Sequence, residues 1–159
     1  MNKKDIIKTI KDYNLDKKEI IIIGGASLVM HDVICDTKDL DIWCSTIYCN
    51  YLLENYNCQL ERINEFGKNA YIIENIINFG ESFKPIDVDI IDGIKVSSLK
   101  DTYLLKKFLN REKDKYVISI LEKLGDAAVS VATSYNNIDK YEEKDEKNQR
   151  KNVNFNKHI

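Results

Sequence analysis

The chain has 159 residues, enough for one domain to bury a core without disulfides or metals holding it together. With 43% hydrophobic and 31% charged residues it has the composition of an ordinary soluble globular protein, and no apolar run is long enough to cross a bilayer. A net charge of −2 excludes an overall electrostatic attraction for nucleic acid, so any polyanion must bind at a local patch.

The beginning of the chain and its cysteines favour a cytoplasmic protein. The first residues, MNKKDIIKTIKDYN, interrupt their isoleucines with charges and lack the continuous apolar stretch of a secretory signal. The four cysteines form no CxxC pair and the two histidines lie far apart, so the spacing does not predict a zinc site. Reduced thiols in an intracellular protein are the simpler interpretation, and no membrane partner is expected.

Four elements are predicted in the first 44 residues. Isoleucines at helical spacing predict an amphipathic helix over 3–13. The continuous β-branched run 20–23 predicts a strand covered on both faces, and a glycine pair ends it. A short helix is predicted over 26–34, followed by a strand over 39–44 in which acidic and apolar residues alternate.

The middle of the chain carries a second set of strand signals. After a helix predicted over 48–56, residues 71–77 predict a strand that two polar residues weaken. The clearest signal is the range 86–96, where IDVDII and IKV flank Asp92-Gly93. Asp-Gly between alternating runs is typical of a tight hairpin turn.

From Ser98 the hydrophobic period becomes helical. Ser98 with Asp101 three residues later resembles an N-terminal cap, and a second helix is predicted over 113–132. Residues 135–159 have few apolar side chains and many charges, which predicts a disordered tail. One domain over 1–134 and a charged tail are therefore expected.

Two carboxylates in the predicted strand 39–44 carry the strongest chemical signal. Asp39 and Asp41 are two residues apart in a strand, so their side chains leave on the same face. Side by side they raise each other's pKa unless a cation lies between them. Mg²⁺ is the natural cation, because it takes oxygen ligands and commonly binds through one or two carboxylates together with substrate phosphates.

A second acidic pair, Asp87 and Asp89, lies in the first strand of the predicted hairpin. If both acidic strand faces converge, three carboxylates can hold two metal ions about 4 Å apart for a phosphoryl transfer. Acidic pairs also arise by chance in a chain with 26 acidic residues, and most such pairs face solvent. A solvent-exposed pair is therefore the alternative interpretation at these two positions.

The glycine pair before the first acids is a candidate phosphate site. Without Cβ atoms, Gly24 and Gly25 let backbone N–H groups approach a phosphate, and a helix that starts there directs its positive end at the anion. Ser27 adds a hydroxyl donor. The alternatives are a simple strand-to-helix turn for the glycines and a helix cap for Ser27.

The order of these residues resembles the signature of nucleotidyltransferases of the DNA polymerase β-like superfamily. That signature is an apolar residue followed by Gly and then Gly or Ser, a spacer, and an apolar-flanked acid–x–acid. Here it reads IGG, thirteen intervening residues and DLDI. The later stretches GIKVSSLKD and REKDKYVISIL, with Lys106-Lys107 between them, resemble the minimal nucleotidyltransferases that include AbiE-type toxins. The resemblance spans roughly residues 20–124.

The resemblance implies an α+β fold with a small mixed sheet flanked by helices, and metal-dependent transfer of a nucleoside monophosphate from an NTP to a hydroxyl. By the same resemblance, the glycine pair would seat the triphosphate, Asp39 and Asp41 would hold the metals, and a third acid would help activate the acceptor. Position favours Asp89 as the third acid, since it lies mid-strand between apolar neighbours, and Asp87 stays open. Two Mg²⁺ ions and an NTP are the cofactor and substrate that the resemblance implies.

A basic segment follows the predicted hairpin. Between residues 95 and 115, seven basic residues stand against three acids, within a chain that is acidic overall. The segment is either a cradle for triphosphate or an RNA backbone, or a solvated helix face with i,i+4 pairs. Arg111 and Lys113 match the R-x-K-D turn of the minimal nucleotidyltransferases, and Lys107 lies in the helix predicted before that turn. These three are the candidate nucleotide-binding side chains.

Three classes of acceptor stay open: tRNA, a protein side chain and a small molecule such as an antibiotic. The sequence shows no separate recognition domain that would distinguish them. A catalytically inactive nucleotide-binding or regulatory module of the same fold is the alternative function, and an interaction protein that has kept the scaffold is a further one.

Overall fold

A computed structural model describes residues 1–82 and 84–134 of the chain. The chain divides into two compact units, one over Met1–Thr102 and a second that begins at Tyr103. The predicted tail over 135–159 lies outside the described residues.

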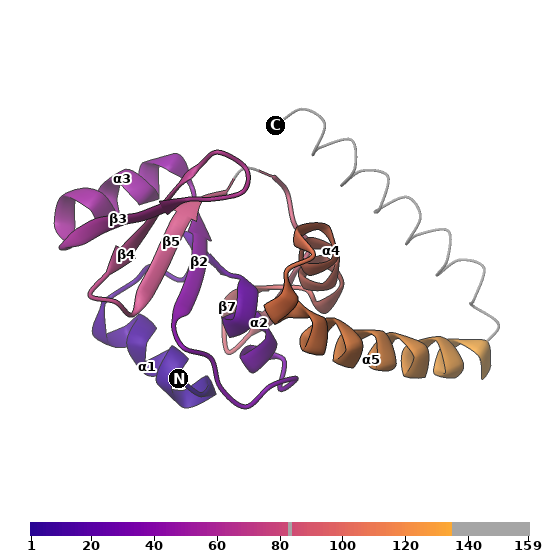
Figure 1. Cartoon of the computed structure of the whole chain (residues 1–159). Coiled ribbons are helices and arrows are strands. Elements are labelled where there is room, and N and C mark those ends of the chain that lie inside the picture. Colours follow the sequence, from indigo (N-terminus) through magenta and orange to yellow (C-terminus); the bar gives the residue numbers. More distant parts are fainter. Residues whose placement is uncertain (83, 135–159) are drawn as a thin grey trace. The chain divides into compact units, whose positions relative to one another are not determined.

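The first unit is built on a mixed seven-stranded sheet, which confirms the predicted α+β architecture. The strands stand in the order β3-β4-β5-β2-β1-β7-β6 (Figure 1). Adjacent strands are antiparallel except for β1 with β7 and β2 with β5, which are parallel. The bounds are β1 (Ile20–Ile22), β2 (Leu40–Cys44), β3 (Cys58–Ile63), β4 (Asn69–Ile73), β5 (Ile77–Glu81), β6 (Val88–Ile91) and β7 (Ile94–Ser97).

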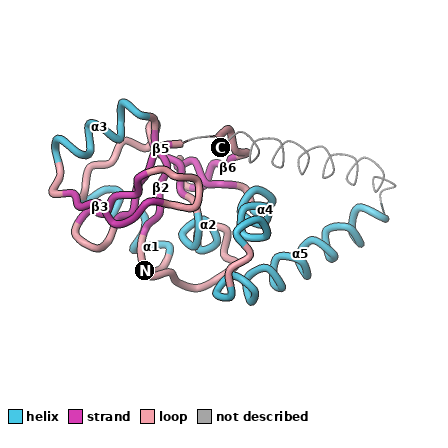
Figure 2. The backbone as a smooth tube through the Cα atoms, turned by 45° about the horizontal axis from the view of Figure 1, so that its top comes forward, coloured by secondary structure: helices cyan, strands magenta, loops and turns pink. Residues whose placement is uncertain are grey.

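Three helices of this unit, α1 (Lys3–Asp12), α2 (Gly24–Met30) and α3 (Thr46–Asn55), contribute to one core with the sheet. The helix α2 contacts β2 and β7, and α3 contacts β5. Figures 1 and 2 show both helices next to the sheet. Strand residues that share this core include Ile22, Leu40, Ile42, Phe79 and Val96, each at most 2% exposed. Because side chains alternate along a strand, Asp41 leaves on the opposite face of the sheet.

Two predicted elements differ from the structure. The single strand predicted over 71–77 is two strands, β4 and β5, because Glu74 and Asn75 form a left-handed turn with φ values of 50° and 58°. The helix predicted to reach residue 34 ends at Met30. There Asp32 takes a φ of 60° and the Val33 N–H donates to the Leu28 carbonyl, which closes the helix end.

The strand β3 was not predicted, because most of its side chains are exposed and it has no buried face to give an alternating pattern. The Asp92-Gly93 hairpin is confirmed, with φ values of 52° and 74° at the turn that joins β6 to β7. Ser98 caps the next helix as predicted, since the Asp101 N–H donates to its Oγ at 3.1 Å.

The remaining helices follow the predicted order. They are α4 (Leu99–Leu109), a short 3₁₀ turn (Glu112–Asp114) and α5 (Lys115–Ser134). Within the residues that the structure describes, no helix is both long and apolar enough to cross a membrane.

Candidate active site

The glycine pair and the acid pair meet at one end of β1 and β2. The Ile23 N–H donates to the Asp41 carbonyl at 3.0 Å, which extends the pairing of the two strands to this point. Gly24 then takes a φ of +62°, a left-handed conformation that favours glycine. A Cβ atom at Gly24 would lie 2.8 Å from Asp41 Oδ2, so only glycine leaves room for the carboxylate here.

The second glycine makes room for a hydroxyl that sequence reasoning missed. A Cβ at Gly25 would lie 2.7 Å from Thr37 Oγ1, so Thr37 packs directly against the glycine backbone. The N-terminal ammonium of Met1 donates to the Thr37 carbonyl at 2.8 Å and fixes this loop two residues before Asp39. A threonine in an irregular loop carries no periodic signal, so nothing in the sequence marks it.

The first turn of α2 begins at these glycines without a side-chain cap, since Ile23 at the N-cap offers no acceptor. Backbone N–H groups at the start of a helix can donate hydrogen bonds to a bound anion. Ser27 does not join them. It is fully buried, donates to the Gly24 carbonyl at 2.6 Å, and lies 3.1 Å from Thr102 Oγ1 in a chain of hydroxyls that ends at Ser97.

The electrostatics of the acid pair are those of two like charges held close together. Burial, and after it the neighbouring Asp39 charge, raise the pKa of Asp41 to about 6, against the lowering effect of a hydrogen bond from Asn78. No basic side chain forms an ion pair with Asp39 or Asp41 within the part of the chain that the structure describes. The negative charge of the pair is therefore offset only by the Asn78 hydrogen bond and by the more distant charge of Arg62.

Asn78 is a second residue that sequence reasoning missed. It stands directly opposite Asp41 in the parallel pairing of β2 with β5, so the two side chains share a face. Its amide oxygen is buried and has no hydrogen-bond partner among the described residues. Farther along the sheet, Glu61 and Arg62 sit at a register shift in β3 and act on Asp41 with opposing charges.

The second acidic pair does not join the first. Asp89 pairs with Val96 on β7, and Val96 pairs with Ile22 on β1, so Asp89 lies on the face opposite Asp41. The edge strand β6 is also three strand spacings from β2, about 14 Å away. Asp89 lies 3.5 Å from His31 Nε2, which itself donates to the Ser97 carbonyl at 3.0 Å.

Asp87 precedes the same edge strand and is exposed. Its backbone N–H donates to the Asp101 carboxylate, and its carbonyl accepts from the Ser98 N–H at 2.9 Å. These bonds fix the entry to the helix α4. The expected convergence of the two acidic strand faces is therefore absent from the described structure, because two other strands separate them and their registers set them on opposite faces.

In the second unit, the basic residues gather around one buried carboxylate. Asp114 is 2% exposed and receives Arg111 Nε at 2.6 Å and Lys106 Nζ at 3.0 Å. Burial opposes its ionisation, but the bonds from Arg111 and Lys106 outweigh that effect and hold its pKa below the ordinary value. Of the predicted nucleotide-binding side chains, Lys107 instead faces Glu122 at 3.9 Å, and Lys113 is exposed.

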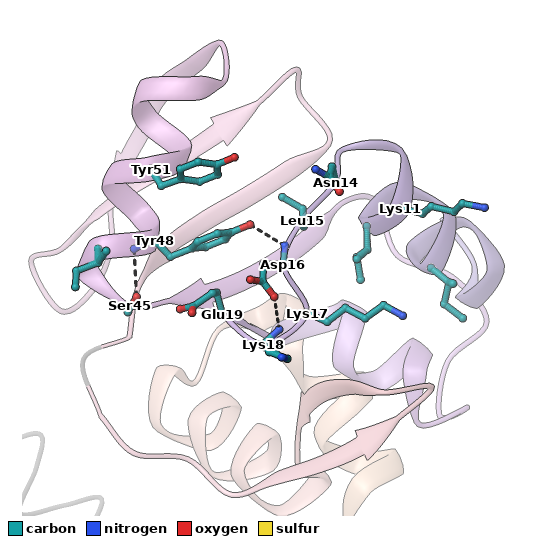
Figure 3. A pocket seen from close by; sticks show the side chains of 13 residues that line it. Lys11, Asn14, Leu15, Asp16, Lys17, Lys18, Glu19, Ser45, Tyr48 and Tyr51 are labelled. Atoms are coloured by element: carbon teal, nitrogen blue, oxygen red, sulfur yellow. Dashed lines mark hydrogen bonds between the residues drawn. The ribbon is translucent and has the colours of Figure 1, made fainter.

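A pocket of about 980 Å³ lies at the other end of β1 and β2 (Figure 3). Figure 3 shows the rings of Tyr48 and Tyr51, stacked 5.4 Å apart, beside the loop that leads into β1. Glu19 and Ser45 line the pocket, and these residues flank the strand ends opposite to those that carry Gly24 and Asp39. The pocket is therefore separate from the acid pair.

The sequence matches the family described as nucleotidyltransferase of unknown function (DUF6036) over residues 3–156. The chain belongs to this nucleotidyltransferase family. No curated protein matches it significantly. The predicted relation to nucleotidyltransferases is thereby confirmed.

Solved structures show that this nucleotidyltransferase shares its fold with distant proteins. The Megavirus polyadenylate synthase is 17% identical with a TM-score of 0.52, over 76% of this chain and 31% of that enzyme, so this chain spans under a third of its length. A Thermotoga maritima protein, provisionally assigned as a nucleotidyltransferase, is 16% identical with a TM-score of 0.50, over 77% and 96% of the two chains. The aminoglycoside-bound ANT(2″)-Ia, solved with adenylyl-2″-tobramycin, follows at 12% identity and a TM-score of 0.47, over 79% and 89%.

Proposed function

We propose that this nucleotidyltransferase moves a nucleoside monophosphate from an NTP to an acceptor hydroxyl at the site formed by Gly24, Gly25, Asp39 and Asp41. The observation that carries the proposal is the close approach of the partly buried Asp41 carboxylate to the left-handed Gly24, where an added Cβ would lie 2.8 Å from Asp41 Oδ2. This approach joins a backbone suited to phosphate with a side chain suited to a cation, and an NTP with its metal ion needs both together.

The residues present fit Mg²⁺. Asp39 and Asp41 offer carboxylate oxygens whose mutual repulsion a cation relieves, and the unpartnered Asn78 amide oxygen adds a neutral oxygen beside them. In the described residues no three His, Cys, Asp or Glu side chains come together as a metal site. The expectation of two Mg²⁺ ions required a third carboxylate from Asp87 or Asp89. The strands β1 and β7 lie between β2 and β6, so neither residue is placed to provide it.

The chemistry follows from these positions. Bound Mg²⁺ supplies positive charge against the triphosphate. The N–H groups at the start of α2 bind phosphate oxygens. Asp39 and Asp41 would hold the metal ion that accompanies the triphosphate. The acceptor oxygen attacks the α-phosphorus, the bond to the bridging oxygen of the β-phosphate breaks, and pyrophosphate leaves while the acceptor proton passes to solvent. Positioning and electrostatics supply most of the rate.

The acceptor class and the compartment complete the proposal. A tRNA end, a protein side chain and a small molecule all present hydroxyls that suit this chemistry. We place the reaction in the cytoplasm, where NTP and Mg²⁺ are both at hand.

A labelling experiment tests the proposal. The protein is incubated with each α-³²P-labelled NTP, Mg²⁺ and a cell extract, and label is followed into RNA, protein and small molecules. We expect one class to be labelled by the wild type and none by the variant with Asp39→Ala and Asp41→Ala. Equal labelling by a folded double variant contradicts the mechanism.

Nucleotide binding without turnover is the second candidate function. One observation favours it, namely that the acid pair has no third carboxylate within metal-binding reach in the described residues. Calorimetry that shows Mg²⁺-dependent NTP binding, together with no pyrophosphate release in any extract, would select this candidate over transfer.

A further inference from the structure

Asn78 is the residue next to Asp41 on the neighbouring strand β5. The strands β2 and β5 run parallel, and their register places Asn78 directly beside Asp41. The residues on either side, Ile77 and Phe79, are at most 2% exposed and point into the helix-covered core. Asn78 therefore shares the Asp41 face through the alternation of the strand.

The chemistry of Asn78 differs from that of a carboxylate in charge and in hydrogen bonding. Its amide is neutral, and it forms a side-chain hydrogen bond with Asp41, in which the N–H₂ group is the donor and the carboxylate the acceptor. This bond takes up an acceptor position on Asp41. A carboxylate in the same place would add a negative charge and further acceptor positions, both of which a second cation needs.

The other end of the amide is available to a bound group. The Asn78 Oδ1 atom is buried and accepts no hydrogen bond from the described residues. Most buried polar side-chain atoms in native proteins have a partner, and leaving one unpaired destabilises the fold. Such an atom beside the acid pair points to a ligand that supplies the missing partner.

Among the described residues, no further acid joins Asp39 and Asp41. The described residues contain no group of three His, Cys, Asp or Glu side chains close enough to share a metal ion. Glu61 acts on Asp41 through its charge, but it is an exposed residue of the outer strand β3, with β4 and β5 between it and β2. Two carboxylates balance the charge of one divalent cation and not of two.

From this placement we propose that Asn78 limits the site to one divalent cation, held by Asp39 and Asp41 beside the Asn78 amide, in place of the two cations of a three-carboxylate site. The inference rests on the proposed function, because it concerns the cation that accompanies the nucleotide. It names Asn78 as the residue that sets the number of ions.

The number of bound ions can be counted with Mn²⁺ as a paramagnetic probe. Free Mn²⁺ is measured by electron paramagnetic resonance while the full chain is titrated at a saturating concentration of an NTP analogue with a methylene bridge between the α- and β-phosphorus atoms. We expect one Mn²⁺ per wild-type chain and two per Asn78→Asp chain. Asn69→Asp, which adds the same charge at an exposed position at the start of β4, is the matched control and keeps one.

Each outcome bears on a different claim. Two Mn²⁺ ions per wild-type chain overturn the inference and leave the proposed function intact, and this count needs no variant to fold. One ion in both wild type and a folded Asn78→Asp variant overturns the role given to Asn78. If neither Mn²⁺ nor the NTP analogue binds the wild type, the proposed function itself fails.

Discussion

Two Asp-x-Asp motifs with the same spacing, each with an apolar residue between and after its acids, have different surroundings in this protein. The motif of Asp39 and Asp41 leads into a central strand, and Asp41 is packed against Gly24 on the face away from the helices. The motif of Asp87 and Asp89 leads into the edge strand β6, on the other face.

The difference in partners is as clear as the difference in position. Asp89 has His31 within 3.5 Å, and the Asp87 backbone is fixed by Asp101 and Ser98. Burial and the like charge of Asp39 both disfavour the charged form of Asp41, and the Asn78 hydrogen bond that favours it comes from a neutral group. An acidic motif indicates a cation site where the protein gives its charge no ion pair, and indicates a structural role where the protein supplies partners.

The largest expected effect is on nucleotide transfer. Asp41→Asn keeps the shape of the side chain but removes the charge. We expect the transfer rate to fall by about 10²–10³-fold, as it does in enzymes that lose one group stabilising the charge of the transition state. Asp89→Asn makes the same change in the other motif and should leave transfer within about twofold, because it lies on the opposite face. Initial rates with an α-labelled NTP measure both, and a comparable loss in the two variants breaks the comparison.

A glycine substitution sharpens the comparison at the backbone. Gly24→Ala combines a left-handed conformation with a Cβ that would lie 2.8 Å from Asp41 Oδ2. We expect it to cost about 1–3 kcal/mol of unfolding free energy and to reduce transfer at least about tenfold, because it displaces the carboxylate.

The matched control is Gly93→Ala in the β6–β7 turn, where φ is +74° but no atom lies within 4 Å of the new Cβ. Strain alone should cost about 1 kcal/mol there and leave transfer unchanged. Urea unfolding and transfer rates separate the two effects. Equal loss of activity in both variants would mean that the approach of Gly24 to Asp41 has no special role.

The pH dependence of stability is the third test. Burial raises the pKa of Asp41 from its ordinary 3.8 to about 6, so between these values the unfolded chain releases a proton that the folded protein keeps. Without Mg²⁺, this residue makes the folded state less stable as pH rises from about 4 to about 6, by at most about 3 kcal/mol, with no further loss above that range.

Asp41→Asn should therefore stabilise the metal-free protein by about 1–3 kcal/mol at pH 7.5 and by little at pH 4. Urea unfolding in EDTA at several pH values measures the difference between this variant and the wild type. A gain for Asp41→Asn that is the same at every pH would contradict the account of its charge.

The smallest expected effect concerns the partner of the second motif. His31→Ala removes a half-buried hydrogen bond to the Ser97 carbonyl and the contact with Asp89. We expect a loss of about 1 kcal/mol in unfolding free energy and no change in transfer. Thermal unfolding with a parallel transfer assay checks this, and a large loss of transfer in a folded variant would place Asp89 and His31 in the active site after all.

Much of the local structure was predictable from the sequence. The β-branched run before Gly24, the alternation in DLDI and the Asp-Gly turn each encode their own conformation, so β1, β2 and the β6–β7 hairpin were placed correctly. The approach of the glycines to the first acids was also predicted, because one short helix connects them in the chain.

The convergence of the two acidic strands was not predictable in the same way. Strand order and register decide which acids meet, and both depend on packing between segments far apart in the chain. The stretch Ile77-Asn78-Phe79 has the same apolar–polar–apolar pattern as the acidic strands, but an asparagine carries no charge to mark it. Asn78 became visible only once β5 was known to lie beside β2.

Calorimetric titration of a non-hydrolysable NTP analogue in Mg²⁺ tests whether the motif of Asp39 and Asp41, and not that of Asp87 and Asp89, holds the cation of the nucleotide. Wild type, Asp41→Asn and Asp89→Asn are compared under the same conditions. The account predicts equal affinity for wild type and Asp89→Asn, and affinity at least about tenfold weaker for Asp41→Asn, since one ligand of the cation is lost. Equal affinity for all three proteins, or a loss in Asp89→Asn that matches the loss in Asp41→Asn, would contradict it.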